Sequence, residues 1–290
     1  MGEHVTGGGL WRARSLIGKC AGCVNIGEGD LLIALRAYLD SSRKPEYEHG
    51  YLTLAAVAGN DEMWAEFETG WKKILDEHKP KADYVHMREI VRLIEGFDPK
   101  RGWDLKSAFD VATQCVGYMS HLDKKRFRMF YCSVDLAAWR KLRAETYQIP
   151  EPVDMCNQFC SETVLGWYLH YYPGLIDPHN DTVKYFFDRH ECFENPFKEK
   201  WNAEKNLAEE TGAWSIWKMI DEVASVEMKT TPGIQAADII AWGMNRETFA
   251  EEGDTAKYLE QIIRQVIPAF HIVWDEAKMR EYFKPLLYLP

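Results

Sequence analysis

The sequence predicts an α/β protein in which helices flank a mixed β-sheet. Two apolar segments, 31–40 and 51–58, follow one another across a short polar loop, which predicts a pair of adjacent antiparallel strands. Further along the chain, apolar stretches of strand length alternate with amphipathic stretches of helix length. That alternation favours parallel crossovers in the later part of the sheet.

Each element is predicted from its own pattern. In the segment 61–78, Trp64, Phe67 and Trp71 recur at helical spacing, and Lys79-Pro80 ends the helix. The same reasoning predicts strands at 31–40, 51–58, 127–134, 182–187 and 223–228. It predicts helices at 61–78, 104–122, 154–171, 197–209, 234–246 and 254–266.

Composition sets limits on the class of protein. The chain has 290 residues, 46% of them apolar, which suffices for a sizeable core. The formal net charge of −10 counts against a broad basic surface for nucleic acid, although bound metal ions can offset an acidic pocket locally. The seven unevenly spaced cysteines are typical of a reducing compartment, and Cys20-Ala-Gly-Cys23 lacks a second pair for a zinc site.

The lengths of the apolar runs predict whether the chain associates with a membrane and whether it carries a signal peptide. No run reaches the roughly 18–20 apolar residues that a spanning helix needs, so we expect no membrane association. Trp11-Arg-Ala-Arg14 is not followed by the apolar core of a signal peptide, which places the protein in the cytoplasm. The glycine-rich residues 1–30 are expected to form a loosely ordered extension before a domain over 31–290.

Four aspartates stand beside predicted buried elements. Asp40, Asp135 and Asp188 come at strand ends, and Asp238 lies in the helix that follows Pro232-Gly233. Carboxylates that meet from different elements repel one another unless a cation lies between them. Because hard oxygen ligands suit Mg²⁺ or Mn²⁺, convergence of these acids predicts a metal-dependent hydrolase site. Each aspartate alone also fits a turn or a helix cap.

Two histidines are candidates for proton transfer, and the sequence lacks the common catalytic and phosphate-binding motifs. His86 and Glu89 are three residues apart, so on a helix they share one face, either as a solvated pair or as a proton-transfer pair at the site. His190, between Asp188 and Glu191, is a further acid/base candidate. The chain has no phosphate-binding loop, no dinucleotide-binding glycine motif, no serine elbow and no His-Glu-x-x-His helix.

Five short motifs, in order, resemble the bacterial and phage family called domain of unknown function 3800. They are Leu39-Asp-Ser-Ser42, His86-Met-Arg-Glu89, Val134-Asp135, Phe187-Asp-Arg-His-Glu191 and Pro232-Gly-Ile-Gln-Ala-Ala-Asp238. The resemblance covers about residues 31–250 and implies a ribonuclease H-like fold. In such folds the first strand's aspartate lies at the sheet centre, and others converge from a neighbouring strand and the last helix.

The resemblance implies a catalytic set of Asp40, Asp188, Asp238, His86 and Glu89, with Asp135 as a fourth metal-binding aspartate. It also implies that Gln235 orients a ligand, binds substrate or caps the helix. Ser41 departs from the family, which has a glutamate at that position.

Three functions therefore remain open. The first is an Mg²⁺- or Mn²⁺-dependent phosphodiester hydrolase, a nuclease acting on nucleic acid. The second is a catalytically silent binding protein on the same fold, which the serine at position 41 favours. The third is a hydrolase of a small phosphorylated or nucleotide substrate, which needs no basic surface. DNA or RNA preference and oligomeric state are not predicted.

Overall fold

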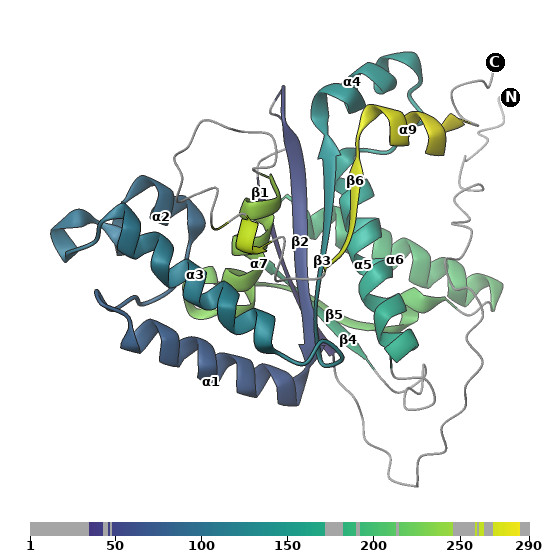
Figure 1. Ribbon diagram of the computed structural model, residues 1–290. Helices are drawn as coiled ribbons and strands as arrows, with labels where there is room; N and C mark the ends of the chain where they lie inside the picture. Colours follow the sequence, from purple (N-terminus) through teal and green to yellow (C-terminus); the bar gives the residue numbers. More distant parts are fainter. Residues whose placement is uncertain are drawn as a thin grey trace, which may run out of the picture.

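The fold is built on one mixed β-sheet with helices on both faces (Figure 1). The computed structural model describes residues 35–42, 46, 48–171, 182–189, 192–212, 215–245, 259, 261–263 and 269–284. The strands described are β1 (Leu35–Ser42), β2 (Tyr51–Asn60), β3 (Phe127–Asp135), β4 (Val183–Asp188), β5 (Ile220–Val226) and β6 (Ala269–Trp274).

The strands lie in the order β5-β4-β1-β2-β3-β6, with β1 near the centre. Strand β1 is antiparallel to β2, as the sequence predicts, and parallel to β4, which is parallel to β5. Strand β3 also follows helices, yet it pairs antiparallel with β2, and β6 runs parallel beside it. This is the α/β arrangement of a mixed sheet flanked by helices that the sequence predicted, and its ribonuclease H-like character stays a prediction.

The helices agree with most of the predicted ranges. Those described are α1 (Asp61–Glu77), α2 (Met87–Arg92), α3 (Leu105–His121), α4 (Leu136–Glu145), α5 (Pro152–Tyr171), α6 (Glu194–Thr211), α7 (Pro232–Asn245) and α9 (Glu276–Tyr282). None of the described helices has the length and apolar content to cross a bilayer. Strand β6 and helices α4 and α9 were not predicted. The predicted 1–30 extension and most of the predicted helix 254–266 lie outside the described residues.

Side-chain alternation in β1 divides the core into two layers. Tyr38 packs with α1, α3 and α7 on one face of the sheet, whereas Ala37 and Leu39 pack with α4, α5 and α6 on the other. Successive side chains of a strand point to opposite faces, so the same rule determines which face each later residue of β1 occupies. Figure 1 shows α1, α3 and α7 together on one side of the strands and α5 and α6 on the other.

Helix α7 begins directly on the central strand because residue 233 is glycine. A Cβ on Gly233 would lie 2.3 Å from Cδ2 of Tyr38, closer than packed atoms approach. The Tyr38 ring is itself fixed, since it stacks on Phe186 at 5.2 Å and meets Trp64 edge-on at 4.6 Å. The first turn of α7 therefore has a fixed position over the carboxyl end of β1.

Candidate functional site

Two aspartates lie on neighbouring strands at the same level of the sheet. Leu39 of β1 pairs with Phe187 of β4 in parallel register, and the next residue of each strand is Asp40 and Asp188. Tyr38 and Phe186, two residues earlier, stack on each other on the α7 face. Side chains two residues apart along a strand share a face, so both acids face α7.

Asp238 reaches the same place from helix α7. Its carboxyl is hydrogen-bonded to the carboxyl of Asp40, and its Oδ2 accepts a hydrogen bond of 2.7 Å from the backbone N–H of Met87. Asp40 and Asp238 are only 3% and 8% exposed, so water solvates them little. Three acids from β1, β4 and α7, each proposed from the sequence, therefore meet at one end of the sheet.

The environment of these acids opposes full ionisation. Burial raises the pKa of Asp238; the charge of His86 and the Met87 N–H act against that rise, and the charge of Asp188 adds to it. Burial likewise raises the pKa of Asp188, although the N–H groups of Arg189 and Met228 favour its charged form. Two carboxyl groups in hydrogen-bond contact cannot both be ionised without a compensating charge, so Asp40 and Asp238 share a proton.

The pair formed by His86 and Glu89 lies next to the three acids. Nδ1 of His86 is 3.1 Å from Oε1 of Glu89, as their spacing predicted. The charges of Asp238 and Asp188 act on the His86 ring. Burial lowers the pKa of His86, but the Glu89 hydrogen bond and the surrounding negative charges outweigh burial, and the net pKa is raised. His86 therefore favours its protonated form at the site.

Glu89 is a buried carboxylate with a complete set of donors. Tyr84 Oη donates to its Oε2 at 2.5 Å, the Gly96 N–H donates at 3.2 Å, and Nζ of Lys229 is 3.5 Å from Oε1. Burial raises the pKa of Glu89, but the hydrogen bonds from His86, Tyr84 and Gly96 lower it to about 2. Glu89 therefore stays ionised and holds the imidazole of His86.

The sequence analysis did not identify Tyr84 or Lys229. Both lie outside helices that present a repeating face, in the loop before α2 and in the 3₁₀ turn Met228–Thr230, so no spacing rule applies to them. Lys229 Nζ lies 4.9 Å from the centre of the Tyr84 ring and 2.7 Å from Glu95 Oε2. The proximity of Tyr84 to His86 along the chain was the only available signal.

Asp135 is not brought to the other acids. Its Oδ1 accepts hydrogen bonds of 3.0 Å from the N–H groups of Ala137 and Ala138, so it is the N-cap of α4. Asp40 pairs with Ala55, and Ala55 pairs with Tyr131. Asp135 thus lies two strands away and roughly 13 Å further along the sheet. We leave this predicted metal ligand out of the candidate site.

The remaining predicted residues have different outcomes. Ser41 continues β1 beyond Asp40 and is half-buried. His190 and Glu191 lie outside the described residues. In the described part of the chain, no three His, Cys, Asp or Glu side chains are placed to hold one metal ion as they stand.

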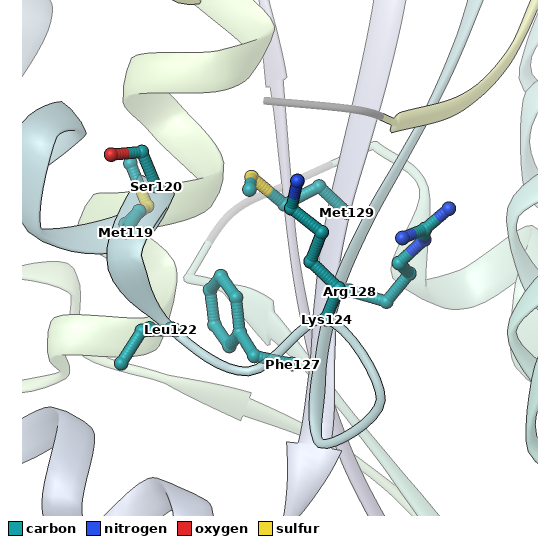
Figure 2. Close-up of a pocket in the computed structure, with 7 residues that line it drawn as sticks. All are labelled: Met119, Ser120, Leu122, Lys124, Phe127, Arg128 and Met129. Atoms are coloured by element: carbon teal, nitrogen blue, oxygen red, sulfur yellow. The ribbon is translucent and has the colours of Figure 1, made fainter. Parts of the chain in front are cut away.

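A small surface pocket lies elsewhere (Figure 2). It is lined by Met119, Ser120, Leu122, Lys124, Phe127, Arg128 and Met129. Phe127 begins β3 and pairs with Gly59, which in turn pairs with Arg36 near the start of β1. The pocket is therefore at the opposite end of the sheet from the acids, and its lining contains no carboxylate.

Comparison with known proteins adds little to this geometry. No family model and no curated protein matches the chain. One chain of the solved PCNA:RNase HII complex from Archaeoglobus fulgidus is 15% identical, with 83% of this chain and 95% of that chain covered and a TM-score of 0.32. A similarity this distant assigns no role to any residue, so the site is interpreted from its own contacts.

Proposed function

We propose that this protein is a divalent-metal-dependent phosphodiester hydrolase that acts on nucleic acid. The observation that carries the proposal is the convergence of Asp40, Asp188 and Asp238 from β1, β4 and α7 at one end of the sheet. Bringing three acids together, two of them buried, is costly without a cation. A function that requires a cation gives this arrangement a physical reason.

The donor chemistry fits Mg²⁺ or Mn²⁺. Carboxylate oxygens are the ligands these ions prefer, and each carboxylate can accept about four hydrogen bonds or metal contacts. One oxygen of Asp238 and one of Asp188 accept backbone N–H groups of Met87 and Met228, at 2.7 and 3.1 Å. These bonds orient both carboxylates and leave capacity for a cation in place of the proton that Asp40 and Asp238 share.

The metal ion and the protein's own side chains have different roles in the proposed reaction. When bound, a divalent ion supplies an activated water and stabilises negative charge on the leaving oxygen. His86, oriented by Glu89 through Nδ1, is the group we assign to proton transfer. Its raised pKa favours the imidazolium, which can donate a proton to the leaving oxygen. Glu89 holds the ring and remains charged.

The overall charge of −10 favours a second candidate, a hydrolase of a small phosphorylated or nucleotide substrate. Among the described residues, two exposed cations near the site are Lys229 and Arg189, and they pair with Glu95 and Glu227, respectively. A polynucleotide would have to compete with those glutamates, whereas a small substrate needs fewer cationic contacts. The two candidates share the same three acids.

Ser41 favours the third candidate, a catalytically silent binding protein. Where the resembling family has a glutamate, this chain supplies a half-buried hydroxyl, which is a weaker ligand for a hard cation. The silent protein would retain the fold and the acid cluster without turnover. Activity assays separate it from the first two candidates.

The test is cleavage with and without Mn²⁺. Single-stranded DNA, duplex DNA, RNA, an RNA–DNA hybrid and a small phosphodiester are incubated with wild type, Asp238→Asn and Asp135→Asn. We expect Mn²⁺-dependent cleavage by wild type and Asp135→Asn, and at least a hundredfold loss in Asp238→Asn. Cleavage of the small phosphodiester alone supports the second candidate. Equal rates in wild type and Asp238→Asn, or no cleavage at all, would contradict a hydrolase centred on these acids.

A further inference from the structure

The side-chain amide of Gln235 is bonded to two separate segments next to the acids. Gln235 is 2% exposed and lies in the first turn of α7, whose position is fixed by the contact between Gly233 and Tyr38. A buried amide costs free energy unless all its donors and acceptors are used. Its partners therefore show what the residue does.

On its oxygen side, the amide holds the segment before α2. Oε1 accepts hydrogen bonds from the backbone N–H of Val85 at 3.1 Å and from Nε1 of Trp71 at 2.8 Å. Val85 is two residues before Met87, whose N–H donates to Asp238 at 2.7 Å. The position of that N–H donor depends on the path of residues 85–87.

On its nitrogen side, the amide holds the 3₁₀ turn Met228–Thr230. Nε2 donates to the carbonyl oxygens of Met228 at 3.0 Å and Lys229 at 3.4 Å. The N–H of the same Met228 donates to Oδ1 of Asp188 at 3.1 Å. This segment therefore carries the backbone donor for a second acid of the site.

We infer that Gln235 is a positioning residue that joins these two segments and so sets the relative placement of Asp188 and Asp238. A primary amide offers two donors and two acceptor sites, and all four are used here. A glutamate at position 235 keeps the acceptor sites but loses both donors. A methionine there has a similar shape but loses all four hydrogen bonds. The inference rests on the proposed function only in saying that this placement serves a metal ion; the joining itself is a property of the metal-free protein.

The matched control is Trp71. Trp71→Phe removes one of the four bonds to the amide and some core packing, but it leaves the bonds to Val85 and Met228 in place. Ile240→Val, on a buried position of α7 whose apolar side chain makes no hydrogen bond to the amide, controls for loss of core packing in that helix. Any effect that merely follows reduced stability appears in these controls as well.

The experiment measures amide hydrogen exchange at Met87 and Met228 in the metal-free protein, and Mn²⁺ affinity by calorimetry. Gln235→Met is expected to lower protection of both amides at least tenfold and to weaken Mn²⁺ binding by about 10–100-fold, the usual effect of losing a residue behind the ligands. Trp71→Phe and Ile240→Val are expected to preserve both quantities within about threefold, because both variants retain the Gln235 bonds to Val85 and Met228.

Unchanged protection in Gln235→Met, loss at only one of the two amides, or equal loss in the controls would overturn the inference. If Gln235→Met does not fold, Gln235→Glu tests the inference instead. In that variant the inference requires that exchange protection falls at the Met228 amide and persists at the Met87 amide. A wild-type protein that binds no Mn²⁺ would contradict the proposed function, while the exchange result would still decide the role of Gln235.

Discussion

The carboxyl of Asp238, on helix α7, is hydrogen-bonded to the carboxyl of Asp40, two residues before the end of the central strand β1. The two residues are almost 200 positions apart in the chain. Their contact exists because α7 begins directly on β1, where Gly233 packs against Tyr38. A hydrogen bond between two acids needs a shared proton, and a cation can take the place of that proton.

Asp238→Asn is predicted to stabilise the metal-free protein at neutral pH. Because burial raises the pKa of Asp238, its charged form is disfavoured in the folded state, and that cost is present above the raised pKa and vanishes as the pH falls below it. Asparagine can still accept from Met87 and donate to Asp40. We expect a gain of about 1 kcal/mol and a rise in Tm of about 2–4 °C.

Differential scanning calorimetry in the presence of a chelator measures this gain, with Asp135→Asn as the control. Asparagine is an equally good N-cap, so that variant should melt with wild type. A lower Tm for Asp238→Asn at neutral pH would mean that the acids do not repel one another in the folded protein.

Glu89→Gln is predicted to destabilise the protein, and to do so less as the pH falls. The folded pKa of Glu89 is lowered to about 2, from 4.5. Its contribution to stability is therefore fully present above about pH 4.5 and is lost as the pH falls toward about 2. We expect a loss of about 2–3 kcal/mol at pH 7, read from urea unfolding, and a smaller loss at pH 3. A pH-independent difference between the two proteins would contradict this role of the charge.

The same substitution is predicted to lower the pKa of His86. In the wild type, burial lowers that pKa, but the hydrogen bond that the ring donates to Glu89 and the charges of Asp238 and Asp188 raise it above 6.5. Removing the Glu89 charge removes the strongest of the raising influences. A pH titration of the histidine ring signals by NMR measures both values. A His86 pKa that is unchanged in Glu89→Gln would show that Glu89 does not control the protonation of this ring.

Local sequence patterns predicted most of the sheet and its helices. Strands β1 to β5 and helices α1, α3, α5, α6 and α7 follow from apolar alternation, helical spacing and turn residues. Helix α4 was missed because Asp135 was interpreted as a ligand at a strand end, whereas Asp followed by Leu-Ala-Ala is also an N-cap pattern. Strand β6 (Ala269–Trp274) was missed because a short apolar run does not distinguish a strand from a helix.

The sequence predicted the acids of the site and the pair of His86 and Glu89, but not the backbone groups that orient the aspartates. Asp40, Asp188 and Asp238 could be named because each stands next to an apolar element. The donors that orient them, the N–H groups of Met87 and Met228, could not be named because every residue but proline carries the same group. Their place depends on the path of two loops, and Gln235, which bonds to both, sets that path through tertiary contacts.

The most direct test of the metal centre is a calorimetric Mn²⁺ titration of wild type, Asp40→Asn, Asp238→Asn and Asp135→Asn. If the three converging acids hold the ion, wild type and Asp135→Asn bind Mn²⁺ stoichiometrically, and both Asp40→Asn and Asp238→Asn lose that binding. Absence of binding in the wild type, or equal binding in all four proteins, would contradict a metal site at Asp40, Asp188 and Asp238.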